Sequence, residues 1–118
     1  MNMPDKLNIL NESIRAFIEE RDWEQFHSPK NLAMALSVEA GELQEHFLWL
    51  TQAESRDLTP GNLSEVEDEI GDVMVYLLRL CDVLGVDPIR AATQKMVKNG
   101  VKYPVEKSRG NAKKYTDL

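Results

Sequence analysis

Two pairs of acidic residues, each set in an apolar run of helical period, constrain the fold of this chain most strongly. Glu39 and Glu42 form the first pair, and Glu69 and Asp72 form the second, both with i,i+3 spacing. This spacing puts both carboxylates of a pair on one face of a helix, with Cβ atoms roughly 5–6 Å apart. Because the flanking residues are apolar, we expect these carboxylates to point inward or into a cleft.

Carboxylates gathered in this way need a cation. An unpaired buried carboxylate is costly, and two like charges about 4 Å apart repel each other by roughly 4 kcal/mol at an effective dielectric of 20. A hard divalent metal such as Mg²⁺, bound through oxygen atoms, is the simplest partner. The competing interpretation is a non-enzymatic helical interaction module whose acidic faces are merely solvated.

The apolar periodicity is helical along the whole chain, and no alternating run predicts a strand. We expect helices at about 5–21, 29–50, 64–85 and 88–99, and a loop at 51–62. Their starts are predicted from Ser28-Pro29, from a Ser64/Glu67 capping box and from Asp87-Pro88. The predicted fold is all-α, an antiparallel four-helix-type bundle of two long and two shorter helices with a mostly irregular basic tail.

Length and composition predict one soluble domain over residues 1–118, large enough to bury roughly two-thirds of its unfolded surface. No stretch reaches the ~20 apolar residues of a membrane span, and no signal-peptide pattern is present at the N-terminus. The single cysteine, Cys81, cannot form an internal disulfide, and we interpret it as a core thiol. We therefore expect a cytoplasmic protein with no membrane partner.

Charge is divided unevenly along the chain, whose net charge is −6. From Lys95 to the C-terminus there are seven Lys or Arg against two acids, whereas residues 1–94 hold seven against 18. An acidic body argues against a nucleic-acid polymer as the main partner. An acidic cluster with a basic tail suits a metal-bound polyphosphate, although a merely solvated tail would have the same composition.

A glycine stands between the two acids of each pair. Gly41 and Gly71 lie inside predicted helices, where glycine costs about 1 kcal/mol relative to alanine. Close approach of a ligand and tight packing against another helix explain these glycines equally well.

At these acidic pairs the chain resembles the all-α nucleoside triphosphate pyrophosphohydrolases, the MazG-like superfamily. The signature of that superfamily is EExxE followed, after a spacer, by ExxD. Residues 39–42 match the last four places of the first half and residues 69–72 match the second, with 26 residues between them. Val38 replaces the first glutamate, which leaves the number of metal ions open.

Within the superfamily, the chain is most similar to the dCTP pyrophosphatase branch, and the similarity covers nearly its whole length. FIEERDWEQFHSPKNL, GELQEHFLW and KYPVEKSRGNAKKYTDL carry this similarity. It implies Mg²⁺-dependent hydrolysis of a (deoxy)nucleoside triphosphate to the monophosphate and pyrophosphate. dCTP is the favoured substrate, and related pyrimidine or modified nucleotides remain alternatives.

The resemblance also assigns roles to residues. It implies that Glu39, Glu42, Glu69 and Asp72 are the catalytic Mg²⁺ ligands. It implies nucleotide binding by Trp23, Trp49 and Tyr76. A K-x-x-x-N-x-x-[KR]-Y element near the phosphates matches Lys95, Asn99, Lys102 and Tyr103. The base that activates water stays open between Glu45 and a metal ligand, as does attack at the α or β phosphorus.

Two further expectations concern other classes of site and the assembly. A ferritin-like di-iron site would need Glu-x-x-His on each of two helices, and the only such spacing, Glu24 to His27, lies in a turn. Two long and two shorter helices would leave apolar faces uncovered, so we expect a homo-oligomer. A dimer is the expected basic unit, and the resemblance implies a tetramer.

Overall fold

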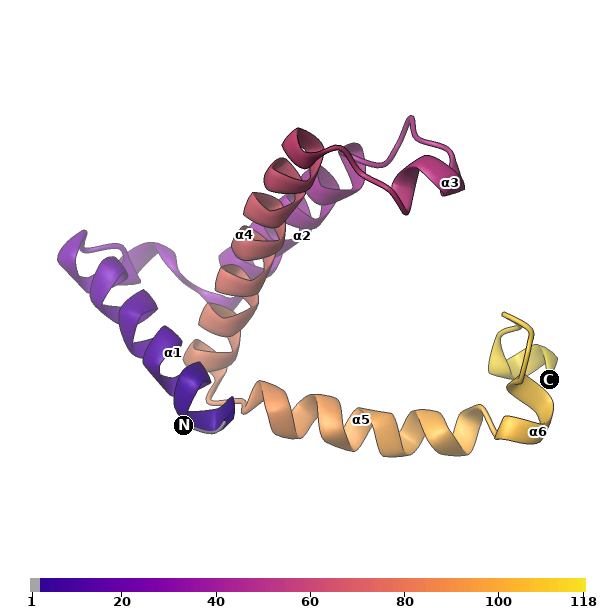
Figure 1. Ribbon diagram of the computed structural model, residues 1–118. Helices are drawn as coiled ribbons and strands as arrows, with labels where there is room; N and C mark the ends of the chain where they lie inside the picture. The colour runs from indigo at the N-terminus through magenta and orange to yellow at the C-terminus, as the bar shows by residue number, and fades with distance from the viewer. Residues whose placement is uncertain (1–2) are drawn as a thin grey trace. The chain divides into compact units, whose positions relative to one another are not determined.

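The computed structural model describes residues 3–118, with side chains from Lys6 onward. Within these residues every regular element is helical, so the predicted all-α class is confirmed (Figure 1). The elements in chain order are α1 (Met3–Glu20), the 3₁₀ turn η1 (Glu24–Phe26), α2 (Pro29–Glu45), α3 (Gln52–Ser55), α4 (Pro60–Leu84), α5 (Pro88–Lys102), α6 (Val105–Ser108) and the 3₁₀ turn η2 (Tyr115–Asp117).

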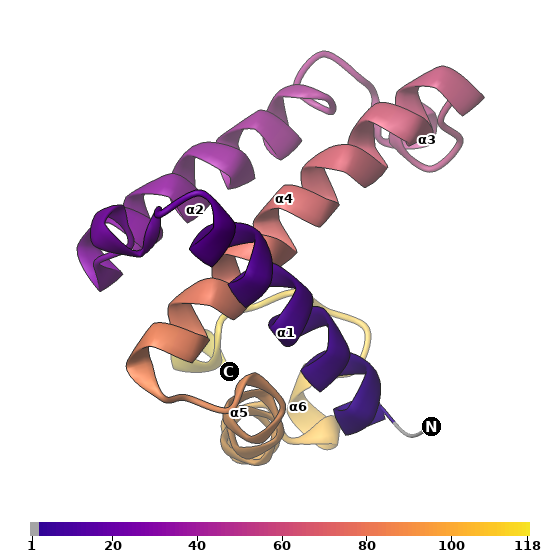
Figure 2. The ribbon, with the colours of Figure 1, turned by 90° about the vertical axis from the view of Figure 1, so that its left-hand side faces the viewer.

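The chain comprises two compact units, Met1–Gly85 and Val86–Leu118. In the first unit, α2 and α4 pack along each other in antiparallel directions, and α1 packs across α4 (Figure 2). The second unit holds α5, α6 and η2. The single domain expected over residues 1–118 stays a prediction.

Several helix boundaries follow the predicted capping residues. The Ser28 hydroxyl accepts a hydrogen bond from the Asn31 N–H at 3.2 Å, and Pro29 opens α2. Gly85 ends α4 in the left-handed region at φ 69°, where glycine carries no Cβ penalty. The Asp87 carboxylate accepts from two N–H groups of the first turn of α5, and this helix continues to Lys102 rather than ending at residue 99.

The predicted start of α4 at Ser64 is wrong. The Thr59 hydroxyl accepts from the Asn62 N–H at 3.2 Å, and Pro60 is the first helical residue. Thr59-Pro60 therefore starts this helix in the way that Ser28-Pro29 starts α2. Ser64 lies inside the helix, so it cannot form the predicted capping box with Glu67.

The connection between α2 and α4 also differs from the prediction. Helix α2 ends at Glu45, and 3₁₀-type bonds such as Phe47 N–H to Gln44 O, at 3.0 Å, tighten the turns that follow. The predicted loop contains α3, because Thr51 and Glu54 form a reciprocal capping box. The tail likewise contains α6 and η2 in addition to irregular segments.

The apolar core of the first unit joins α1 to the second half of α4. Ile14 and Ile18 of α1 pack with Leu78 of α4, and all three are buried. Cys81 of α4 is half-buried. In the described part of the chain, no helix combines the length and the hydropathy that crossing a membrane requires.

Candidate metal centre and adjoining cavity

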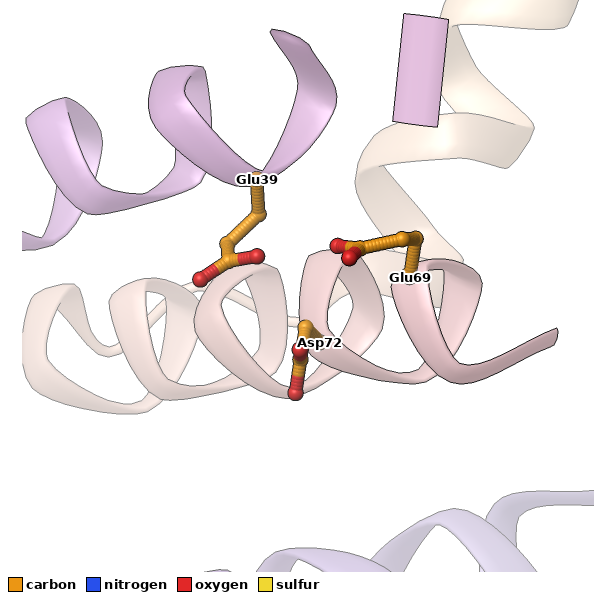
Figure 3. A group of neighbouring side chains, drawn as sticks. All are labelled: Glu39, Glu69 and Asp72. Carbon is orange, nitrogen blue, oxygen red and sulfur yellow. The ribbon is translucent and has the colours of Figure 1, made fainter. Parts of the chain in front are cut away.

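Three of the four predicted carboxylates come together between α2 and α4. Glu39 extends from α2, while Glu69 and Asp72 come from one face of α4 (Figure 3). One carboxylate oxygen from each residue lies within 4.8 Å of the other two. The i,i+3 spacing brings the two α4 acids together, and the antiparallel packing of α2 adds the third.

The environment of these carboxylates fits a hard cation. The Oε2 atoms of Glu39 and Glu69 are buried and accept no hydrogen bond from the described residues. Burial, together with the neighbouring Glu42, Glu69 and Asp72, raises the pKa of Glu39 to about 7. A divalent metal would satisfy the unpaired oxygens and offset the repulsion, and carboxylate oxygens are the ligands that Mg²⁺ and Ca²⁺ prefer. The group contains no histidine, so it does not resemble the di-iron alternative.

Glu42, the fourth predicted ligand, is exposed and lies outside the group of three. It is nevertheless close enough to Glu39 to contribute to the raised pKa of that carboxylate. A Cβ atom added at Gly41 or Gly71 would meet nothing within 4 Å among the described residues. Tight packing against another helix of the first unit therefore does not explain either glycine.

A cavity of about 430 Å³ adjoins the carboxylates and shares Asp72 with them. Trp23 and Tyr76, both predicted nucleotide-binding residues, line this cavity. The ring of Phe17, another lining residue, packs edge-on against Trp23 with centroids 5.8 Å apart. The whole set of lining residues is Leu10, Ser13, Ile14, Phe17, Ile18, Trp23, His27, Asp72, Val75, Tyr76 and Arg79.

A charged network that no sequence motif predicts contributes His27 and Arg79 to the lining of the cavity. Arg79 is only 9% exposed. Its Nε donates a hydrogen bond to Nδ1 of His27 at 3.2 Å, and its NH1 group donates one to Oδ2 of Asp82, also at 3.2 Å. The hydrogen bond from Arg15 holds the pKa of Asp82 below its usual value. The sequence carried a signal for this network, because Arg79 interrupts the apolar run Leu77–Cys81, where a charge requires partners.

The remaining predicted nucleotide-binding residues lie elsewhere in the chain. Trp49, in the turns after α2, is 88% exposed and does not line the cavity. The second unit holds the other four residues: Lys95, Asn99 and Lys102 lie in α5, and Tyr103 follows it directly. The Lys102 ammonium lies 4.7 Å from the centroid of the Tyr115 ring, which also packs edge-on against Tyr103.

Comparison with known proteins decides the family. A model of the MazG-like family matches residues 34–118, which include all four acids of the two pairs. This chain belongs to the MazG-like family. Three of the four acids of its MazG-like signature form the carboxylate group between α2 and α4, and the resemblance noted from the sequence is confirmed.

Among MazG-like relatives, the chain is similar to dCTP pyrophosphatases. It is 47% identical over 104 residues to dCTP pyrophosphatase 1 of Rattus norvegicus and 41% identical over 104 residues to that of Homo sapiens. Each alignment covers 86% of this chain and 61% of the relative, so the chain spans about three-fifths of the length of these proteins.

A solved structure shares the fold. A pyrophosphatase from Archaeoglobus fulgidus superposes with a TM-score of 0.80 at 43% sequence identity. The superposition covers 84% of this chain and 93% of the archaeal one.

Proposed function

We propose that this chain hydrolyses a (deoxy)nucleoside triphosphate to the monophosphate and pyrophosphate. The observation that carries the proposal is the double role of Asp72, which belongs both to the carboxylate group and to the wall of the aromatic cavity. A metal-bound triphosphate needs this combination, because its phosphates and its base must be bound side by side. The similarity to proteins named dCTP pyrophosphatase makes dCTP, or a related pyrimidine or modified nucleotide, the proposed substrate.

Glu39, Glu69 and Asp72 would hold Mg²⁺, with Glu42 as a further acid beside Glu39. When bound, Mg²⁺ supplies Lewis-acid and template effects on the phosphoryl oxygens. The carboxylates themselves fix the position of the phosphate chain relative to the cavity. A carboxylate oxygen left free of the metal can orient the attacking water by accepting its hydrogen bond.

The aromatic wall suits a nucleobase. Phe17 and Trp23 present a large apolar surface, and stacking of a base on such rings contributes about 1–3 kcal/mol. Tyr76 follows Asp72 by about one helical turn and lines the same cavity, so we assign Tyr76 to nucleotide binding as well. We assign the base to this cavity and the phosphates to the carboxylate end.

Nucleotide binding by residues of the second unit is also part of the proposal; these residues are Lys95, Asn99, Lys102 and Tyr103. Lysine ammonium groups can donate charge-assisted hydrogen bonds to phosphate oxygens. The Tyr115 ring restrains the Lys102 ammonium at 4.7 Å, which lowers the entropy cost of holding that charge in place.

We infer that the working form is a homo-oligomer built on a dimer, with a tetramer as the larger assembly. Large apolar side chains of α2 and α4 are exposed, including Met34, Val38 and Ile70, and Trp49 is almost fully exposed. Sedimentation at micromolar concentration tests this inference. A monomer under those conditions would contradict it.

A panel of canonical and modified triphosphates, assayed with Mg²⁺, tests the proposed function. We expect release of monophosphate and pyrophosphate, with pyrimidine deoxynucleotides turned over fastest. Release of inorganic phosphate with a diphosphate product would overturn the assignment of the cleaved bond. No turnover of any triphosphate would overturn the enzymatic assignment and favour a helical interaction module.

A further inference from the structure

The cavity exists only while α1 lies against α4. Five of its eleven lining residues belong to α1 and four belong to α4, whereas the chain between α1 and α2 supplies the other two. The carboxylate group, by contrast, lies between α2 and α4 (Figure 2). A movement of α1 away from α4 would therefore open the cavity and leave the carboxylate group in place.

A small apolar contact holds α1 in this position. Ile14 and Ile18 pack against Leu78 of α4, and no other described side chain of α1 is buried. On the same helix, Ile9 and Phe17 are about half exposed. Among the described residues, α1 has no contact of comparable extent with any element other than α4. Segments with few buried apolar contacts open at low free energy, so the docking of α1 depends on what else fastens it.

An ion pair fastens α1 to α4 beside this apolar contact. Arg15 donates from Nε to Oδ2 of Asp82 at 2.8 Å, and from a terminal nitrogen to Oδ1. The planar guanidinium thus binds both carboxylate oxygens, which fixes the relative orientation of the two side chains. Arg15 directly follows the buried Ile14, so the ion pair lies at the edge of the apolar contact.

The surroundings allow this ion pair to break without leaving a charge unpaired. The Arg15 side chain is 51% exposed, so water solvates its guanidinium when the pair opens. Asp82 has a second partner on its own helix, because its Oδ2 also accepts from Nη1 of Arg79 at 3.2 Å. The buried Arg79 therefore stays paired with Asp82 whether or not Arg15 is bound. The contact between Arg15 and Asp82 is a reversible fastening.

The end of α1 has the backbone geometry of a hinge. The Trp23 N–H donates to the Ile18 carbonyl at 3.1 Å, which closes the helix with a Schellman turn. Asp22 adopts φ 53°, and it is the only described residue other than glycine with a positive φ. Side chains occupy that region at a cost, and hinge motions are absorbed by a few residues at the ends of elements. A change of φ at Asp22 would swing α1, while Ser28 keeps the start of α2 capped.

We propose that α1 is a hinged cover of the cavity, fastened by Arg15 to Asp82, and that it swings outward to admit and release the nucleotide. The inference rests on the function proposed above and adds a conformational step to it. Arg15 is a positioning residue, because it contacts α4 and does not line the cavity. Opening of the cover limits how fast a nucleotide enters once that nucleotide is in excess.

Stopped-flow binding of dCMP, followed by the fluorescence of the cavity residue Trp23, tests the cover. In wild type we expect the observed binding rate to reach a plateau as the dCMP concentration rises, because the plateau is the opening rate. Arg15→Met keeps an apolar stem but removes the guanidinium, and it should raise the plateau by about threefold. Arg15→Lys keeps the charge without the two-pronged contact and should give an intermediate plateau.

Salt provides a second readout on the unmodified chain. Screening weakens an exposed ion pair, so the wild-type plateau should rise by about twofold between about 0.05 M and about 0.5 M NaCl. The plateau of Arg15→Met should not respond to salt. Because the plateau is a unimolecular rate, screening of the charge on dCMP does not contribute to it.

Arg56→Met is the matched control. Arg56 is exposed at the end of α3 and forms no ion pair with the described residues, so this variant should keep the wild-type plateau and its response to salt. A wild-type rate that rises in proportion to dCMP without a plateau would overturn the cover and leave the proposed function intact. A plateau that neither Arg15→Met nor salt changes would do the same. A chain that binds no dCMP and turns over no triphosphate would overturn both proposals.

Hydrogen exchange of the nucleotide-free protein tests the fastening without any ligand. We expect the amides of α1 to exchange faster in Arg15→Met than in wild type, while the amides of α2 exchange equally in both. A general loss of stability would instead speed exchange in both helices. Equal exchange of α1 in the two proteins, or faster exchange in both helices of the variant, would contradict the proposal.

Discussion

Glu39 of α2 and Asp72 of α4 place carboxylate oxygens within 4.8 Å of each other. The two residues lie on different helices, so the backbone of neither helix alone brings them together. Repulsion between such groups in a partly buried site must be offset by a cation or by protonation. The functional assignment depends on this relationship, and so do the first two predictions.

Binding of Mg²⁺ should stabilise the fold. A ligand that binds only the folded state raises the unfolding midpoint, and a concentration a hundred times the Kd adds about 2.7 kcal/mol. Thermal unfolding with and without Mg²⁺ should show a clear upward shift for wild type and little or none for Glu69→Gln. Asp68→Asn changes the adjacent exposed acid and should keep the full shift. An unchanged midpoint in wild type would contradict the metal site.

Stability of the metal-free protein should depend on Glu39 near neutral pH. The pKa of Glu39 is about 7 in the folded chain, above its ordinary value of 4.5. Its contribution to stability is therefore fully present below pH 4.5 and is lost as pH rises through about 7. Denaturant titrations between pH 5 and pH 8 should show this decline in wild type and a flatter profile in Glu39→Gln. A matching decline in the variant would assign the pH dependence to another group.

Removing Asp82 should leave the Arg79 guanidinium buried without its carboxylate. We expect Asp82→Ala to lower the free energy of unfolding by about 3 kcal/mol, because breaking a buried pair leaves an uncompensated charge. Glu20→Ala is the control, since Glu20 forms an exposed pair with Arg21 at 3.6 Å and should cost less than about 1 kcal/mol. Equal small costs in both variants, measured in urea, would show that the network contributes little.

Gly71→Ala should stabilise the isolated chain. A Cβ at this position meets open space, and alanine is favoured over glycine inside a helix by about 1 kcal/mol. Urea unfolding of the metal-free protein should show this gain. If the variant instead loses stability together with its oligomeric state in sedimentation, then a neighbouring subunit approaches the glycine.

Much of the fold could be predicted from short local signals. Helix starts are marked by Ser28-Pro29 and Asp87-Pro88, because the capping side chain accepts hydrogen bonds from N–H groups of the first turn. The end of α4 is marked by Gly85, which adopts the left-handed conformation. Thr59-Pro60 carries the same signal as Ser28-Pro29, but the overlapping Pro60-Gly61 is equally typical of a loop. The Thr51/Glu54 capping box lies in the same predicted loop, where the sequence has no long apolar run to indicate a helix.

The candidate site was only partly predictable, because tertiary packing decides which acids meet. The spacing of Glu69 and Asp72 fixes their common face, whereas the relative rotation of α2 decides that Glu39 joins them and Glu42 stays exposed. The pairing of His27 with Arg79 joins a turn to a distant helix, and no local pattern in the sequence specifies that contact.

The most direct test measures pyrophosphate release from dCTP with Mg²⁺ by Glu39→Gln and Asp72→Asn. Both variants remove a charge from the carboxylate group and leave the side-chain volume nearly unchanged. We expect each variant to lower turnover by about a hundredfold or more. Circular dichroism should show unchanged helical content in both. The control variant Asp68→Asn should keep wild-type turnover. Near-normal turnover in either site variant would contradict the assignment of these carboxylates to catalysis.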